Sequence, residues 1–304
     1  MIEKIKRLII FVISYTALSA CSDIQNLSNN DPVDNTDPAV YKNASDSSGA
    51  ILSAFYGLDD SIPWLASLRI CGELGHRDGM PVVFSEEVDL DTLEAGDFLV
   101  TLSDGETTGV GCVTPAPATD LGEFRTILMI GDFGSIDNQP TMVTIRGNLL
   151  SLDQKSNFKN ASVMVTPLEH GPFLVHAELV DTAQWEIGKQ GTRLPFGGGD
   201  GCPLGTQQII RVVWAGGVTK PGGNEIDDQE RTAYQVILED GSNITPFAIG
   251  DLGDGDNNHQ LCLNTKSPVQ RVEFPEGLMT DPREDLNPAT AISVKNLPRP
   301  ILKI

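Results

Sequence analysis

An internal repeat with a period of about 130 residues constrains the fold of this chain more than any other feature of its sequence. Six short segments recur in the same order at nearly one offset. The matches are Cys71 with Cys202, Pro81–Phe84 with Ile209–Trp214, Val100–Gly105 with Val236–Gly241, Asp120–Gly122 with Asp251–Gly253, Val143–Ile145 with Val272–Phe274, and Ala161–Val165 with Ala289–Val294. Each match is short, but their shared order indicates two homologous units.

Within each copy, short apolar runs alternate with polar residues and end at Asp-Gly pairs, as in VTLSDG at 100–105 and QVILEDG at 235–241. The chain also contains 30 glycines and 19 prolines, and it has no long apolar pattern of helical period. Period-two strands punctuated by turns over about 100 residues are typical of a β-sandwich. The sequence therefore predicts an all-β protein.

The first copy carries a more specific pattern over residues 68–167. Its segments are Val82–Val88, Asp91–Leu93, Asp97–Thr101, Asp104–Gly105 and the late run Val143–Ile145. In these segments it resembles a bacterial Ig-like domain of the type repeated in surface proteins, although it adds two cysteines. The resemblance implies two tandem Ig-like β-sandwich domains behind a disordered N-terminal tether. It implies little about chemistry, because such folds support many functions.

The N-terminus has the organisation of an export signal. Met1–Arg7 carries three cations and one acid, and Leu8–Ala20 is an apolar run too short to span a bilayer comfortably. The run ends in Leu18–Cys21 (LSAC), which resembles the lipobox of bacterial lipoproteins. The resemblance implies cleavage before Cys21 and membrane anchoring by acyl chains, including palmitate, on that cysteine. The alternatives are an ordinary secretory signal or an uncleaved anchor helix.

These features predict four segments along the chain. They are a signal peptide at 1–20, a flexible tether at 21–50, a first Ig-like domain at 51–168 and a second at 169–304. The tether is rich in Asn, Asp and Ser and has too few large apolar residues to form a core. Ser22 after the lipidated cysteine resembles the pattern that sorts enteric lipoproteins to the outer membrane. The predicted location is the cell outer membrane, on its periplasmic or surface face.

The strongly acidic composition limits the partners of the protein. The formal net charge is −21, and removal of residues 1–20 takes away three cations and one acid to leave −23. Nucleic acid and anionic lipid head groups need a basic surface, so the sequence argues against both. The excess acid is then either a solvated surface or a source of ligands for divalent cations. An extracytoplasmic protein or polysaccharide is the expected kind of partner.

Four cysteines remain after Cys21, and in an oxidising compartment an even number predicts two disulfides. Cys71 and Cys202 occupy equivalent places in the repeat, and each copy holds one later cysteine. The predicted bridges are therefore Cys71–Cys112 and Cys202–Cys262. Neither forms a Cys-x-x-Cys motif, so we expect a stabilising role.

Two acidic loops of the second copy are candidate calcium sites, because short oxygen-bearing side chains on a glycine-containing loop suit a hard cation. The candidate ligands are Asp254, Asp256 and Asn258 in the first loop, and Asp281 and Asp285 in the second. An EF-hand is excluded, because His259 and Thr265 stand where its glycine and bidentate glutamate belong. The alternative is a pair of ordinary polar turns, which use the same residue types.

The sequence contains no HExxH, GxSxG or Walker-type motif, and no catalytic residue is predicted. The predicted function is a lipid-anchored, non-enzymatic binding, adhesion or structural module of the cell envelope, with calcium as a candidate stabilising ion. One alternative is an envelope hydrolase that uses the acidic metal-binding loops. Another is a glycan-binding module that uses Trp64 or Trp185 as a stacking platform, whereas Trp214 lies in an apolar strand and is predicted to be core.

Overall fold

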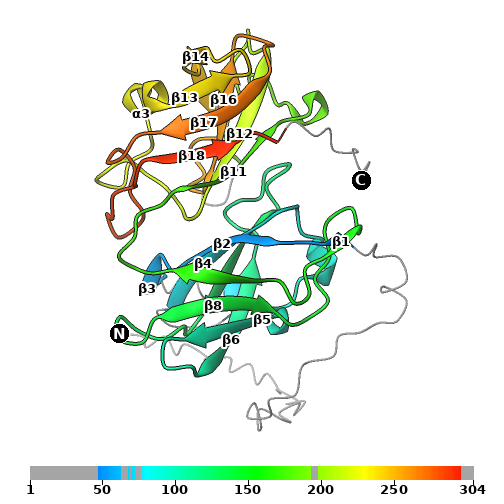
Figure 1. Cartoon of the computed structure of the whole chain (residues 1–304), viewed down its shortest axis with the longest axis vertical. Coiled ribbons are helices and arrows are strands. Elements are labelled where there is room, and N and C mark those ends of the chain that lie inside the picture. The colour runs from blue at the N-terminus through cyan, green and yellow to red at the C-terminus, as the bar shows by residue number, and fades with distance from the viewer. Residues whose placement is uncertain (1–46, 63–67, 69, 73–76, 193–197, 296–304) are drawn as a thin grey trace, which may run out of the picture. The chain divides into compact units, whose positions relative to one another are not determined.

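The computed structural model describes residues 47–62, 68, 70–72, 77–192 and 198–295. The predicted signal peptide, Cys21 and Trp64 lie outside the described residues. The described chain is built mainly from β-strands, with short turns of 3-10 helix and the short helix α3 (Asp228–Ala233), so the all-β prediction is confirmed (Figure 1). Within these residues, no helix has the length and apolar character needed to cross a membrane.

The strands up to residue 166 form one large sheet and one small pair. The large sheet contains β2 (Ile51–Phe55), β3 (Leu58–Ile62), β4 (Arg77–Phe84), β5 (Phe98–Leu102), β6 (Thr107–Thr114), β7 (Thr126–Gly131), β8 (Pro140–Ile145) and β10 (Ser162–Thr166). Their order is β2-β10-β8-β5-β6-β7-β4-β3, and β2 also pairs with β4. Seven strands therefore close into a barrel, and β3 adds to β4 outside the ring. The small pair is β1 (Ser47–Ser48) with β9 (Ser156–Asn157), so regular structure begins inside the segment predicted as tether.

Two features close the barrel. At one seam, β10 runs parallel to β2 through the pairs Val165 with Ala54 and Thr166 with Phe55. At the other, β6 pairs with β5 over its first residues and with β7 from Val110 onward, with a bulge at the change of partner. A bulge bends a strand and increases its twist, which lets one strand belong to both sides of the ring.

The predicted fold class of two tandem Ig-like sandwiches is therefore wrong. A sandwich needs two sheets with separate edges, whereas here the continuous β6 and the β2–β10 pairing join the edges into one closed barrel. Alternating apolar residues specify where strands form and which face they bury. They do not specify whether the edge strands of neighbouring sheets meet, and the prediction failed at that step.

The strands from residue 174 onward form two four-stranded antiparallel sheets. One has the order β11 (Leu174–Leu179), β12 (Gln208–Trp214), β16 (Asn258–Leu263) and β15 (Ala248–Gly250). The other has the order β14 (Asn243–Ile244), β13 (Gln235–Leu238), β17 (Val269–Phe274) and β18 (Thr290–Ser293). Helix α3 precedes β13 and starts with a capping box, in which Asp227 and Glu230 each accept a backbone N–H of the first turn.

The sequence repeat reappears in the strand pairing. In the first half β4 pairs with β2 and β7, and β8 pairs with β5 and β10. In the second half β12 pairs with β11 and β16, and β17 pairs with β13 and β18. The irregularities of pairing also agree. The β2–β4 pairing shifts register between Ile51 and Ser53, and the equivalent β11–β12 pairing shifts register between Leu174 and His176. The two halves thus share one pattern of pairing.

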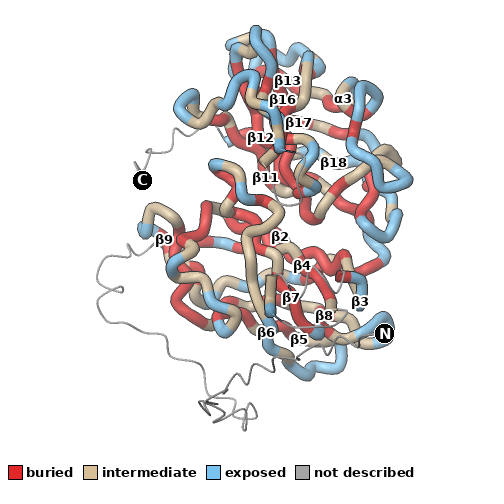
Figure 2. The backbone as a smooth tube through the Cα atoms, turned by 180° about the vertical axis from the view of Figure 1, so that it is seen from behind, coloured by how far each residue is buried: buried red, intermediate tan, exposed pale blue. Residues whose placement is uncertain are grey.

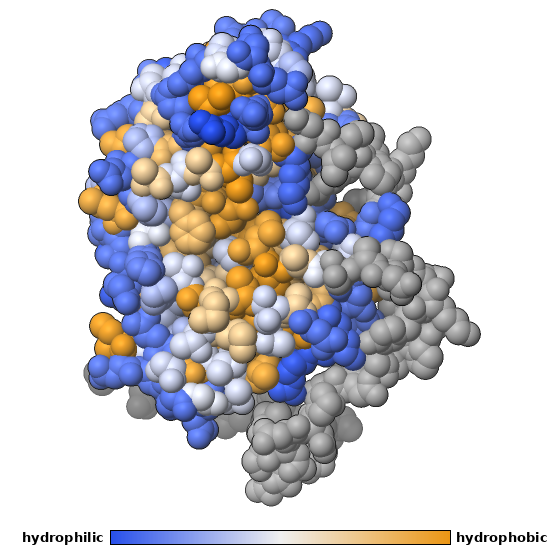
Figure 3. All heavy atoms as spheres, in the orientation of Figure 1, coloured by the Kyte–Doolittle hydropathy of each residue, from blue (hydrophilic) through white to orange (hydrophobic). Residues whose placement is uncertain are grey.

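Each half has its own apolar core, visible as buried stretches along the strands in Figure 2. Phe84 packs edge-on against Phe98 and Phe158 in the barrel. Trp214 occupies the equivalent strand end in the second half and is fully buried, as predicted. Hydrophobic residues also gather toward the middle of the face shown in Figure 3, with hydrophilic residues around much of its margin.

Candidate functional site

Both predicted disulfides are present. Cys71 bonds to Cys112 of β6, with 5.6 Å between their Cα atoms, and Cys202 bonds to Cys262 of β16, with 5.7 Å. Cys71 lies in the segment before β4 and Cys202 in the segment before the equivalent strand β12, and each bonds to a later strand of the same half. The pairing follows the repeat, as the sequence predicted.

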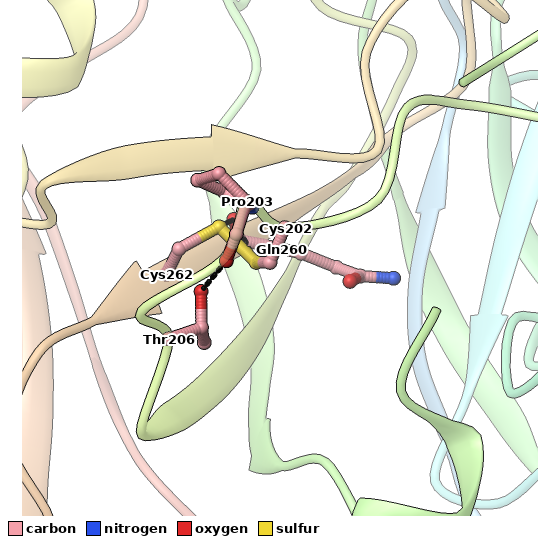
Figure 4. The surroundings of a disulfide bond; sticks show 5 residues. All are labelled: Cys202, Pro203, Thr206, Gln260 and Cys262. Carbon is pink, nitrogen blue, oxygen red and sulfur yellow. Dashed lines mark hydrogen bonds between the residues drawn. A yellow bond between two sulfur atoms is a disulfide. The ribbon is translucent and has the colours of Figure 1, made fainter. Parts of the chain in front are cut away.

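Figure 4 shows the second bridge, between Cys202 and Cys262. The two cysteines belong to a small core of their own. Cys202 and Cys262 are fully buried and pack with Val180 and Ile209. Trp185 packs against the same group, and its Nε1 donates to the carbonyl of Val180 at 3.1 Å. The bridge therefore stabilises the fold, and the Trp185 ring belongs to the packing around it.

A buried charge network connects residues from both halves. Arg125, which is fully buried, donates from Nη2 to Glu178 Oε2 at 2.9 Å and from Nη1 to the Phe84 carbonyl at 3.1 Å. Arg211 of β12 lies 3.5 Å from Glu178 Oε1 and donates to the carbonyls of Leu121 and Gly122 at 2.7 and 2.9 Å. Such groups are stable in a protein interior only when paired and hydrogen-bonded.

The pKa values of this network follow from its charges. Burial alone would raise the pKa of Glu178, but Arg125 and the hydrogen bond from His176 outweigh it and lower that pKa to about 2. Burial, and then repulsion from Arg125, lower the pKa of His176 to about 4. Glu178 is therefore ionised and His176 neutral near pH 7.

A second polar group, which we call the acid cluster, consists of Asp120, Glu123 and Asp251. One carboxylate oxygen from each lies within 4.8 Å of the others. The turn after β6 shapes its first part, because the Asp120 N–H donates to Glu123 Oε2 at 2.8 Å. Asp120 Oδ2 in turn accepts the N–H of Gly199 at 2.9 Å.

The repeat itself supplies the acid cluster. Asp120 begins the tetrapeptide Asp-Leu-Gly-Glu at 120–123, and Asp251 begins Asp-Leu-Gly-Asp at 251–254. The glycine of each tetrapeptide adopts a left-handed conformation, with φ of 94° at Gly122 and 97° at Gly253. The sequence showed the matching Asp-Leu-Gly triplets, but they served only as markers of the repeat. The structure brings the two copies together.

Glycines of the segment 198–201 fit closely around the acid cluster. A Cβ on Gly199 would lie 2.8 Å from the Asp251 Cα and 2.9 Å from Asp254 Oδ2. A Cβ on Gly198 would clash with Asp120 Oδ1. The sequence analysis did not assign these residues to a site, but glycine at both positions is what lets the backbone approach the carboxylates.

Two oxygens of the acid cluster have no donor. Glu123 Oε1 and Asp251 Oδ2 are buried, and no N–H or hydroxyl group in the described parts of the chain donates to either. The two carboxyl groups instead lie close enough to interact with each other, and besides burial a hydrogen bond between them contributes to the raised pKa of Asp251. Glu123 is fully buried and Asp251 is 3% exposed. Burial, and then the charge of Glu123, raise the pKa of Asp251 well above its usual value. An unsatisfied buried carboxylate is costly, so this arrangement calls for a cation or a shared proton.

The predicted calcium ligands lie partly beside this cluster. Asp254 is half-buried, and burial followed by the charge of Glu123 raises its pKa to about 7. Asp256 and Asn258 bond to each other instead, since both Asp256 oxygens accept from Asn258 at 2.7 and 2.8 Å. Metal binding by these residues stays a prediction.

The second predicted loop forms a turn. Asp281 is buried, and its Oδ1 accepts the N–H groups of Arg283 and Asp285 at 2.9 and 3.0 Å. Asp285 lies 3.7 Å from the Arg283 side chain. Among the described residues, neither Asp281 nor Asp285 belongs to a group of three potential ligands like the acid cluster.

An apolar cavity of about 160 Å³ lies beside the turn between β15 and β16. Its walls include Phe55, Pro81 and Leu128, and its polar edge includes Asp256 and Asn257. The wall is mostly apolar side chains and backbone, which suits packing more than chemistry.

Comparisons with known proteins do not assign a family. No protein-family model matches the chain, and no curated protein matches it. A search of solved structures returns the N-terminal part of the bacterial S-layer protein SbsC, at 11% sequence identity and a TM-score of 0.26. The match covers 82% of this chain and 44% of that one, so this chain spans less than half of the other's length. A likeness at this TM-score carries no argument about fold or function.

Proposed function

We propose that the protein is a lipid-anchored component of the cell envelope that acts as a non-enzymatic binding, adhesion or structural module. The observation that carries this proposal is the pair of disulfides, Cys71–Cys112 and Cys202–Cys262. Disulfides persist in oxidising compartments and are rare in the cytosol. Together with the LSAC sequence ending at Cys21, they support an extracytoplasmic protein held to a membrane by its N-terminus.

The arrangement of the described residues supports a rigid module. Two apolar cores and two cross-links stabilise the body, and the buried pair of Arg125 and Glu178 ties residues of the two halves together. Rigid β-structures are suitable scaffolds for surfaces that bind other molecules. The glycan-binding alternative has no observation in its favour among the described residues, because Trp185 packs against the second disulfide.

The test is membrane fractionation of the wild-type protein and a Cys21→Ala variant in a bacterial host, with incorporation of labelled palmitate as a second readout. We expect the wild type in the membrane fraction with label, and the variant released without label. Both should show two intact disulfides by mass mapping of non-reduced peptides, which makes that readout the control for folding. A Cys21→Ala variant that stays membrane-bound, or a wild type with free thiols, would contradict the proposal.

A further inference from the structure

We propose that Asp120, Glu123, Asp251 and Asp254 bind one hard divalent cation, for which calcium is the probe. This cation site differs from the set of ligands expected from the sequence, with which it shares only Asp254. It does not depend on membrane anchoring, so it stands or falls separately from the proposed function.

Unsatisfied oxygens carry the argument. Glu123 and Asp251 each place a carboxylate oxygen in the acid cluster, and both side chains are shielded from solvent. No N–H or hydroxyl group of the described residues donates to Glu123 Oε1 or Asp251 Oδ2. Turns and surface acids normally satisfy their carboxylates with backbone N–H groups or water. Two buried carboxylates this close together need either a shared proton or a cation between them, and the donor set and local charges favour the cation.

The donor set selects the kind of ion. The acid cluster consists of three carboxylates and includes no histidine or cysteine among the described residues. Asp254, which lies beside it and feels the charges of Glu123 and Asp120, adds a fourth carboxylate. Hard cations such as calcium prefer oxygen ligands, whereas zinc and copper prefer nitrogen or sulfur. Carboxylates can each bind through one or two oxygens, and water can complete the coordination.

The local charges leave room for a divalent ion. Lys189 lies 3.5 Å from Asp120 Oδ1, and Arg211 acts electrostatically on Glu123 and Asp251. Arg211 also faces Glu178, and Lys189 also pairs with Glu186, so these two cations do not neutralise four ionised carboxylates. A divalent cation would offset the negative charge that remains. Asp256 is not counted among the ligands, because Asn258 occupies both of its oxygens.

The site would also have a structural consequence. Asp120 and Glu123 belong to the turn between β6 and β7 of the barrel, and Asp251 and Asp254 belong to the turn between β15 and β16. Because equivalent tetrapeptides of the two halves supply the ligands, an ion here would cross-link the two copies of the repeat. Calcium would then stabilise the whole body rather than one loop.

The experiment uses the purified full-length protein in detergent, stripped with a chelator. Equilibrium dialysis with radioactive calcium should give one ion per chain, and saturating calcium should raise Tm by about 5 °C or more. The isosteric variants Glu123→Gln and Asp251→Asn should each lose both effects. Asp281→Asn is the matched control, because Asp281 is also buried with an unpaired Oδ2 but lies in another loop. It should keep the calcium response.

In chelator, Glu123→Gln and Asp251→Asn should melt no lower than the wild type, because each removes repulsion between buried acids. If either fails to fold, Asp120→Asn replaces it, since its amide oxygen can still accept the Gly199 N–H. A wild type that neither retains calcium nor shifts its Tm would overturn the proposal and indicate a proton shared by Glu123 and Asp251. Calcium binding that survives in both variants but is lost in Asp281→Asn would also overturn it.

Discussion

The two halves of the molecule use one pattern of strand pairing but differ in closure. In the first half, β6 runs without a break from its pairing with β5 to its pairing with β7. In the second half, the corresponding residues form two short strands, β14 and β15, separated by Thr245–Phe247. Pro246 lies in this gap and has no N–H to donate to a neighbouring strand. A proline-containing interruption thus accounts for one of the two places where the second half stays open.

The opposite seam differs in the same way. In the barrel, β2 and β10 pair through two residues each. In the second half, β11 reaches the chain beyond β18 by a single parallel bridge between Glu178 and Lys295. The comparison shows that nearly equivalent sequence patterns can give a closed or an open structure. We therefore expect the open half to depend more on its side-chain cross-links, and the predictions below test this.

Removal of each disulfide should have the largest effect and should be worse in the open half. The bridges close loops of 41 and 60 residues, and loops of these lengths correspond to about 4 kcal/mol in the chain-entropy model. Cys202→Ala with Cys262→Ala also removes two fully buried sulfurs, whereas Cys71 and Cys112 are only partly buried. Urea unfolding of both double variants measures the difference. If the Cys71→Ala/Cys112→Ala variant loses more free energy of unfolding than the other, the open half does not depend more on its cross-links.

Much of the fold was predictable because its determinants are local or repeated. Alternating runs such as VTLSDG identified strands, and the repeat identified equivalent cysteines, so the all-β class and both disulfide pairs followed. Closure was not predictable, because it depends on two-residue pairings such as Val165 with Ala54, between segments more than 100 residues apart.

The acid cluster was missed for a related reason. Asp254 was recognised because it lies among other acids in the sequence, which is the pattern of a calcium loop. Glu123 and Asp120 stand in a less acidic segment, and their nearness to Asp251 arises only when the two halves pack. The available signal was the tetrapeptide Asp-Leu-Gly-acid, which occurs once in each copy.

The pH dependence of stability should differ between the halves, with an effect of about 2 kcal/mol. His176 in β11 is paired with Val213, and the equivalent residue in β2 is Ser53, paired with Val83. Burial, then Arg125, lower the folded pKa of His176 from 6.5 to about 4, so the unfolded chain binds the proton more readily. Above pH 6.5 His176 is neutral in both the folded and the unfolded chain, so it costs no stability. As the pH falls toward 4, proton uptake by the unfolded chain lowers the free energy of unfolding, by about 2 kcal/mol at pH 5.

The test places the residue of the barrel at this position of the open half. His176→Ser should lower stability at pH 7, because it removes the hydrogen bond to Glu178 and part of the packing. Between pH 7 and pH 5, however, the variant should lose about 2 kcal/mol less than the wild type. Chemical unfolding at both pH values gives this difference. If the wild type and the variant lose the same free energy of unfolding between pH 7 and pH 5, the pKa of His176 is not lowered in the folded protein.

The smallest predicted effect concerns the strand that closes the barrel. An added Cβ at Gly111 of β6 would lie 3.1 Å from the Ile130 carbonyl oxygen of β7, whereas a Cβ at Gly109 would meet nothing within 4 Å. We therefore expect Gly111→Ala to cost about 1 kcal/mol through crowding. Gly109→Ala is the matched control and should be neutral or slightly stabilising, since it restricts the unfolded chain. Thermal unfolding of the two variants measures this contrast. If both alanines cost the same, β6 needs glycine for backbone freedom along its length, and closure of the barrel then depends on a flexible strand rather than on close approach at one residue.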